Sequence, residues 1–399
     1  MAARDIYTEL GVERRINAAG TLTRLGGALM ASDVVEAMAQ AAGASVDVAE
    51  LQAAASTRIA MATGAQAGLV TSGAAAALTL AAAASMTRWD VARISALPHA
   101  EAFPHEILLH RSQRTGYSRA FEAAGARLVD FGHNDRTAGA GVRGIEPWEI
   151  EAAITNHTAA LAFSATPDNS NDLALAARVC RERGIPVIVD AAAQLPPKTN
   201  LRRFVELGAD LVAFSGGKAI GGPQASGILA GRADLVGAAL VQQIDMDVTP
   251  ESWEPPGLID RVAMGGVPHH GIGRGFKVGK EEIVGLLVAL ERFCKADDGA
   301  ANASLSDRLR AIAEAIQNCP GVVAQLKPAA ETGRVPVLEL MLDGDVLAFS
   351  RELQRGDPPI HLSERHTARG ILLLDPQALR PEDDALIAAA ISEISRKSL

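Results

Sequence analysis

A single lysine stands in the glycine-rich stretch from Ser215 to Gly222, which reads SGGKAIGG and follows an apolar run from Asp210 to Phe214. The apolar run predicts a buried strand, and the glycines allow tight turns and close approach to a ligand. An amine at the end of a buried strand can be desolvated, which makes it nucleophilic near neutral pH. Lys218 is therefore a candidate for a Schiff base with a carbonyl group. On this stretch alone, a surface lysine in a turn explains the pattern equally well.

A second apolar run, Ile185 to Val189, ends in Asp190. An acid at the carboxyl end of a buried strand is costly unless it meets a cation, although it can also cap a helix. The pyridinium nitrogen of pyridoxal 5'-phosphate (PLP) is such a cation, and an aspartate partner keeps it protonated. Ligands of open α/β sheets bind beyond the carboxyl ends of strands. Lys218 and Asp190 together therefore favour a PLP site.

A third stretch supplies a candidate phosphate cradle. The apolar run at Leu69 and Val70 meets Thr71, Ser72 and Gly73 and then becomes a long alanine-rich segment from Ala74. This pattern predicts hydroxyl and backbone N–H groups at a helix N-terminus, which suits an anion. An ordinary serine cap is the alternative.

The elements that must position these residues alternate between strand and helix. Strands are expected at 107–109, 127–131, 159–163, 185–190, 210–214 and 226–230, the last either parallel or antiparallel, and helices at 32–38, 48–63, 118–124, 147–155 and 173–183. Such alternation predicts an α/β fold with a largely parallel, doubly wound sheet. Further strands at 335–342, 361–362 and 370–374 and helices at 279–294, 304–318 and 381–396 predict a smaller C-terminal α/β domain.

We expect three parts: an N-terminal segment 1–45 that packs with the small domain, a large PLP-binding domain 46–265, and a small C-terminal domain 266–399. Proline-rich and glycine-rich stretches between residues 247 and 274 predict a long loop region. Arg274 and Lys277 crowd the following segment. They are candidates for binding a substrate carboxylate or phosphate, or else form a solvated helix start.

Composition narrows the classes of function. The 399 residues are 48% hydrophobic and carry a net charge of −9 with both signs interspersed, so we expect no nucleic-acid partner and no membrane association. The charged N-terminus does not resemble a signal peptide, and three scattered cysteines suit a reducing compartment, which predicts a cytoplasmic protein. His269 and His270 have no further ligands at metal-binding spacing, so no metal is expected. His361 and His366 are interpreted as surface or loop residues.

Taken together, the motifs resemble a known family, the selenocysteine-synthase-like fold type I PLP enzymes, and within it the D-glucosaminate-6-phosphate ammonia-lyase-like proteins. The similar stretches run in family order over most of the chain: INAAGTLTRLGG (16–27), VTSGAAAAL (70–78), AGARLVDFG (124–132), PVIVDAAAQLPP (186–197), FSGGKAIGGPQASGIL (214–229) and KVGKEEIVGLL (277–287).

The resemblance implies roles for individual residues. Lys218 would be the Schiff-base lysine and Asp190 the partner of the pyridinium. The phosphate would be bound by Ser72, Gly73 and Ala74, with help from Ser215. Gln194 would lie beside the ring, and Asn17 and Thr21 are candidates for substrate contact or form an ordinary turn. Gln113 stands where family members commonly have a histidine suited to stack on the ring, and it is a further candidate for cofactor binding.

The resemblance implies a PLP-dependent lyase that performs α,β-elimination on a hydroxylated amino acid, with or without a phosphate, to give a 2-oxo acid and ammonia. The alternatives are a racemase or epimerase using the same residues, selenium-transferase-like chemistry on a seryl substrate, and a binding or regulatory protein without turnover. Fold type I relatives also imply a homodimer or a higher homo-oligomer.

Overall fold

The chain divides into two compact units in the computed structural model, which describes residues 5–134 and 144–397. The larger unit is Met30–Cys294, and the smaller combines Met1–Leu29 with Lys295–Leu399. An N-terminal segment thus groups with the C-terminal part of the chain.

The boundaries of these units differ from the expected boundaries at residues 45 and 265. Helix α2 (Ser32–Ala42) and nearly all of helix α12 (Lys280–Lys295) fall in the larger unit. The reason is packing, because Val34 of α2 and Leu286 of α12 are buried in the same apolar cluster as the strands of the main sheet.

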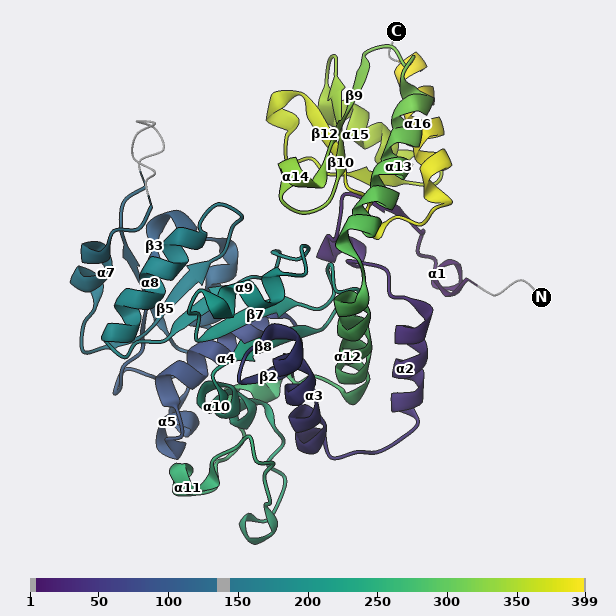
Figure 1. The fold of residues 1–399 in the computed structure, drawn as a ribbon. Helices are drawn as coiled ribbons and strands as arrows, with labels where there is room; N and C mark the ends of the chain where they lie inside the picture. The colour runs from purple at the N-terminus through teal and green to yellow at the C-terminus, as the bar shows by residue number, and fades with distance from the viewer. Residues whose placement is uncertain (1–4, 135–143, 398–399) are drawn as a thin grey trace. The chain divides into compact units, whose positions relative to one another are not determined.

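The larger unit is built on a seven-stranded sheet with the order β2-β8-β7-β6-β5-β3-β4 (Figure 1). All neighbouring strands are parallel except that β8 runs antiparallel to both β7 and β2. This arrangement confirms the predicted doubly wound, largely parallel sheet with its antiparallel strand after the lysine loop. The strands are β2 (Ala67–Thr71), β3 (Glu106–His110), β4 (Arg127–Phe131), β5 (Thr158–Ser164), β6 (Val187–Asp190), β7 (Leu211–Ser215) and β8 (Gly227–Gly231).

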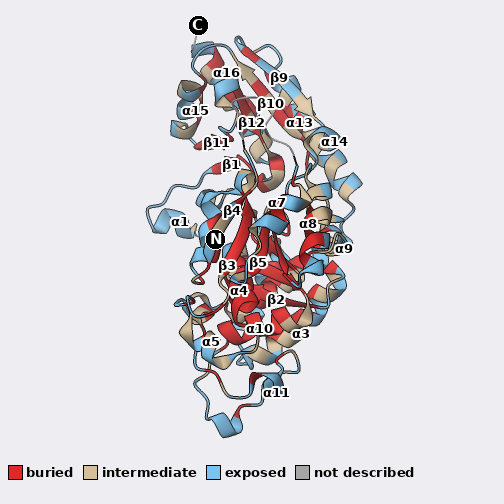
Figure 2. Cartoon of the chain, turned by 90° about the vertical axis from the view of Figure 1, so that its left-hand side faces the viewer, coloured by how far each residue is buried: buried red, intermediate tan, exposed pale blue. Residues whose placement is uncertain are grey.

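Helices cover both faces of the sheet. One apolar cluster joins it to α4 and α10, and the other joins it to α3, α8, α9 and α12. Strands β3 and β5 and helix α10 are largely buried (Figure 2). No helix within the described residues is long and apolar enough to cross a membrane. The helices of this unit, besides α2 and α12, are α3 (Val48–Thr63), α4 (Ala74–Thr87), α5 (Val91–Ala96), α6 (Arg119–Glu122), α7 (Pro147–Ala153), α8 (Ser170–Glu182), α9 (Asn200–Glu206), α10 (Ala233–Gln243) and α11 (Arg261–Met264).

The edge strand β2 is protected by polar side chains of α3. Gln52 donates to the carbonyl of Val70 at 2.8 Å and accepts from its N–H at 3.0 Å, as a neighbouring strand would. One turn further along α3, Ser56 accepts from the N–H of Gly68 at 3.0 Å. These bonds satisfy backbone groups that an open sheet edge would leave unpaired, and they fix the strand that leads into Ser72 and Gly73.

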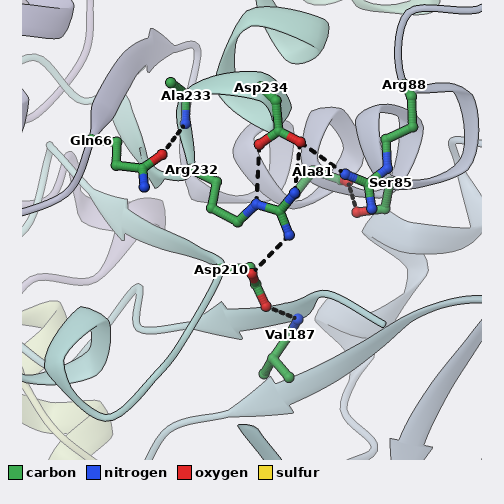
Figure 3. Close-up of polar contacts among 9 residues, drawn as sticks. All are labelled: Gln66, Ala81, Ser85, Arg88, Val187, Asp210, Arg232, Ala233 and Asp234. Carbon is green, nitrogen blue, oxygen red and sulfur yellow. Dashed lines mark hydrogen bonds and ion pairs between the residues drawn. The ribbon is translucent and has the colours of Figure 1, made fainter. Parts of the chain in front are cut away.

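An ion-pair network joins elements at the amino ends of strands β6 and β7 (Figure 3). Arg232 donates to both carboxylate oxygens of Asp234, at 3.0 and 2.7 Å, and contacts Asp210 at 3.2 Å. Asp210 also accepts from the N–H of Val187 at 2.9 Å, and Arg88 at the end of α4 contacts Asp234 at 3.1 Å. The network connects the starts of β6 and β7 to helices α4 and α10, away from the carboxyl ends of these strands.

The smaller unit contains a three-stranded antiparallel sheet, β12-β10-β9, and a parallel pair formed by β1 and β11. His361 lies on β11 and is only 5% exposed, so its interpretation as a surface or loop residue was wrong. Its burial follows from pairing between strands at opposite ends of the chain. The elements are α1 (Ile6–Glu9), β1 (Ile16–Ala18), α13 (Asp298–Ile316), β9 (Val322–Lys327), α14 (Ala329–Thr332), β10 (Val337–Leu342), α15 (Val346–Arg355), β11 (Ile360–Leu362), β12 (Ile371–Leu374) and α16 (Asp383–Lys397).

Candidate active site

The predicted site residues of the larger unit gather at one edge of its sheet. Strands β2, β5, β6 and β7 run in the same direction, so their carboxyl ends meet there. The register aligns Ser164 with Asp190, and it aligns Gly227 of β8 with both Ser215 and Thr71. The lysine loop, the acid and the candidate phosphate turn therefore leave the sheet side by side.

The loop that carries Lys218 is folded tightly onto itself. The N–H of Gly216 donates to the carbonyl of Ser226, and the N–H of Gly222 donates to the carbonyl of Gly216, both at 2.9 Å. A Cβ atom on Gly216 would lie 2.2 Å from the Ser226 hydroxyl, and one on Gly217 would lie 2.7 Å from the Cα of Gln224. The loop thus requires its glycines, and it holds the half-buried Lys218 at a defined place beyond β7.

Asp190 and Lys218 interact electrostatically at this edge. Burial raises the pKa of the Asp190 carboxyl, while a hydrogen bond from the N–H of Ala192 and the charge of Lys218 oppose the increase in pKa. The hydrogen bond from the N–H of Ala192 to the Asp190 carboxylate is 3.0 Å long. A buried carboxylate whose ionised form is costly is a favourable partner for an incoming cation.

The turn before α4 lies against the sheet. Gly73 adopts φ +140° and precedes the first residue of α4, Ala74, and the hydroxyl of Thr71 donates to the carbonyl of Gly73 at 2.9 Å. The first N–H groups of an α-helix have no acceptor within the helix. In a helix of 14 residues they present a positive end beside the lysine loop.

Ser72 connects this turn to a segment far along the chain. Its hydroxyl donates to the carbonyl of Phe276 at 2.8 Å, so the residue before Lys277 is bound to the candidate phosphate turn. Lys277 itself is exposed. Arg274 forms an ion pair with Asp245. Of the two predicted anion-binding cations, Arg274 is thus already balanced by an acid of its own chain.

Gln113 and Gln194 lie on loops at the same edge. The Gln113 side chain accepts from the N–H of Ser164 at 2.9 Å. Gln194 is half-buried, its N–H donates to the carbonyl of Ala191 at 3.0 Å, and its own carbonyl accepts from Asn200 at 2.7 Å. Ser164 was not predicted as a site residue, although its place at the end of an apolar strand was a signal that could have found it.

Asn17 and Thr21 belong to the smaller unit. Asn17 is buried, its side chain donates to the carbonyl of Gly20 at 2.8 Å, and it accepts from the N–H of Ala19 at 3.2 Å. Gly20 has φ +81°, and a Cβ there would lie 2.6 Å from a carboxylate oxygen of Asp375. The INAAGT motif is thus a turn closed by Asn17 over Asp375, and a substrate contact of Asn17 or Thr21 stays a prediction.

His270 lies near two acids, Asp245 and Asp247, in an exposed cluster that the sequence spacing did not indicate. Its Nδ1 accepts from the N–H of Met246 at 3.2 Å, so its Nε2 carries the proton and faces Asp247 at 3.2 Å. Both ring nitrogens are thereby used in hydrogen bonds, and Arg274 occupies Asp245. This arrangement explains the cluster without a metal ion.

The described residues fit PLP in three respects. The N-terminus of α4 suits a phosphate, and the buried Asp190 suits a pyridinium. Lys218 supplies an amine from the loop between β7 and β8, and these two strands lie between β2, which leads into α4, and β6, which ends in Asp190. Gly227 leaves room for the phosphate turn, because a Cβ at this position would lie 2.5 Å from Gly73. The fold and the site define a fold type I PLP-dependent enzyme.

Comparisons with known proteins agree with this class. The family model of SelA, L-seryl-tRNA selenium transferase, matches residues 119–246. D-glucosaminate-6-phosphate ammonia lyase of Salmonella typhimurium is 30% identical over 98% of either chain. A 5'-C-glycyluridine monooxygenase-decarboxylase of a Streptomyces species is also 30% identical, over 97% of this chain and 91% of its own. A solved structure of D-glucosaminate-6-phosphate ammonia-lyase superposes with a TM-score of 0.81 at 28% identity, covering 100% of this chain and 99% of the other.

The chain therefore belongs to the selenocysteine-synthase-like family of fold type I PLP enzymes, within its D-glucosaminate-6-phosphate ammonia-lyase-like branch. It is a PLP-dependent enzyme of the lyase type.

Proposed function

We propose that this enzyme eliminates ammonia from a hydroxylated amino acid and releases a 2-oxo acid, with a phosphorylated, sugar-derived amino acid as the expected substrate. The observation that carries the proposal is the meeting of Lys218, Asp190 and the α4 N-terminus at one sheet edge, in a chain similar over its full length to an ammonia lyase. The alternatives are racemisation and transfer to a seryl substrate, and the second has less support because two L-seryl-tRNA(Sec) selenium transferases align over only 34% and 56% of this chain.

Each residue of the site has its own role in the proposed reaction. When bound, PLP links covalently to amines and withdraws electrons from the substrate's α-carbon. Lys218 would supply the amine that holds the cofactor, and its free amine would take the proton from the substrate's α-carbon. Asp190 would pair with the protonated ring nitrogen. Backbone N–H groups at Gly73 and Ala74, with Ser72 and Ser215 beside them, would hold the phosphate. Loss of the β-hydroxyl as water and hydrolysis of the carbon–nitrogen bond give the 2-oxo acid and ammonia.

A substrate screen tests the proposal. Purified enzyme with PLP is incubated with D- and L-amino acids, including hydroxylated and phosphorylated sugar-derived ones, and 2-oxo acid, ammonia and carbon dioxide are measured. Equal amounts of 2-oxo acid and ammonia support elimination. Inversion at the α-carbon without ammonia would instead indicate racemisation, and release of carbon dioxide would indicate the decarboxylation named for the Streptomyces relative.

The same family also suggests assembly and location. We propose a homodimer or higher homo-oligomer in the cytoplasm, in which Lys277 serves the neighbouring site, because it is exposed while Arg274 is held by Asp245. Mixing Lys218→Ala chains with Lys277→Ala chains should restore activity above either parent if sites are shared. A monomer by light scattering contradicts the assembly, and cell fractionation tests the location.

A further inference from the structure

Gln113 has a side-chain orientation that the structure determines. It ends the short 3-10 turn Arg111–Gln113 that directly follows β3, next to the end of β5. The backbone N–H of Ser164 points to the terminal group of Gln113 at 2.9 Å. An N–H group can only donate, so the atom that faces it is the amide oxygen, Oε1, and the amide nitrogen Nε2 points elsewhere.

Ser164 holds Gln113 at a second point, because its hydroxyl lies 3.4 Å from the main-chain carbonyl of Gln113. Ser164 is itself fixed, since its carbonyl accepts from Asn169 at 2.9 Å. It is the register partner of Asp190, on a strand about 4.8 Å away. The Gln113 amide is therefore held at the end of β5, one strand away from β6, whose acid suits the cofactor ring.

The Nε2 group of Gln113 forms no hydrogen bond within residues 5–134 and 144–397. It carries two N–H donors, and its partner oxygen is already committed. An amide also lacks the aromatic face that would stack on a ring. What this group can offer an occupant of the site is hydrogen-bond donation.

We propose that Gln113 Nε2 donates a hydrogen bond to an anionic oxygen of the site's occupant, either the ring oxygen of PLP or the carboxylate of the substrate, and that Ser164 is the positioning residue that orients it. The inference rests on the proposed function. Gln113 would then contribute to the specificity of binding by donating a hydrogen bond in a fixed direction.

Gln113→Glu provides the sharpest test, because it keeps the length of the side chain and an oxygen for the Ser164 N–H but replaces the donor with a carboxylate. Loss of a hydrogen bond to a charged oxygen should weaken binding about 10-fold or more. If the acceptor belongs to PLP, the Kd of the apoenzyme for PLP rises and the visible absorption maximum shifts. If it belongs to the substrate, KM rises while PLP affinity stays the same.

Gln66→Glu is the matched control. The Gln66 side-chain oxygen also accepts from a backbone N–H, that of Ala233 at 3.1 Å, but it lies at the other end of the sheet, so PLP affinity and KM should stay within about twofold of wild type. A Gln113→Glu enzyme that is folded and keeps both values within twofold overturns the inference. Failure of the wild-type protein to bind PLP at all would instead refute the proposed function, so the two failures are distinguishable.

Discussion

Gly227, the first residue of β8, lies so close to Gly73 that a Cβ atom on it would be 2.5 Å from the Gly73 carbonyl carbon and 2.7 Å from the nitrogen of Ala74. The backbone of the candidate phosphate turn thus rests directly on the strand that follows the lysine loop. The two segments fit together only because residue 227 has no side chain.

Gly227→Ala should displace this turn and weaken PLP binding. Overpacking of this kind costs about 1–3 kcal/mol, so we expect the Kd of the apoenzyme for PLP to rise about 10-fold or more. Titration of the apoenzyme, followed by visible absorbance, measures the change. Gly257→Ala is the control, because a Cβ at Gly257 meets no atom within 4 Å. Equal PLP affinity in the two variants would show that the turn does not bind the phosphate.

Lys218 should be the residue that PLP modifies. Reduction of the PLP-loaded enzyme with borohydride and peptide mapping should place the label on Lys218, since its loop holds the amine between Asp190 and the α4 N-terminus in the strand order. Lys218→Ala should remove the label and the activity. Lys280→Ala, at a lysine paired with Glu281, should keep both. A label on another lysine refutes the assignment.

Asp190→Asn should change stability and turnover in opposite directions. Burial raises the pKa of Asp190 above its ordinary value of 3.8. In the apoenzyme, the contribution of this carboxyl to folding stability is therefore fully present below pH 3.8, and it is lost as the pH rises through the folded-state pKa. The apo variant should therefore melt at a higher temperature than wild type near pH 7.5, and the difference should vanish towards pH 4.

Turnover by the Asp190→Asn enzyme should fall about 10²-fold or more, because an amide cannot hold a proton on the ring nitrogen. Calorimetry of the apoenzymes across pH and steady-state kinetics of the loaded enzymes measure the two effects. Near-normal turnover would mean that Asp190 does not pair with the ring nitrogen.

Arg232→Lys should lower stability without changing the site. A lysine cannot bind both oxygens of Asp234 while also reaching Asp210, and because the side chain of Arg232 is 39% exposed the expected loss is only about 1 kcal/mol, or about 2 °C in Tm. Arg310→Lys, at an exposed pair within one helix, should change Tm by less. If both variants lose the same amount, the network in Figure 3 has no special role.

Cys180 should resist alkylation in the folded enzyme. Burial raises the pKa of its thiol to about 12, so almost no thiolate forms at pH 8. Cys319, which is partly exposed, should react with iodoacetamide first. Mass spectrometry of peptides after brief labelling checks the order. Rapid labelling of Cys180 without unfolding would show that its surroundings open.

Several elements could be predicted from local pattern alone. Helix α3 and strand β4 begin and end at the predicted residues, because periodicity and flanking breakers are encoded within each segment. Helix α10 was missed, since Leu235 to Val241 is buried on all sides and shows no polar face. Strand β1 was missed because its three residues form a strand only through pairing with β11, at the other end of the chain.

The candidate chemistry could be inferred from local pattern, as a lysine in a glycine loop and an acid, each at the end of an apolar strand, because strand ends and glycine turns are local properties. Which of these groups lie together follows from the fold. Only the order and register of the strands place Ser164 beside Asp190 and Gly227 beside Gly73, and only packing brings Asp245 to Arg274 and Phe276 to Ser72. Such contacts join residues distant in sequence, and no local pattern encodes them.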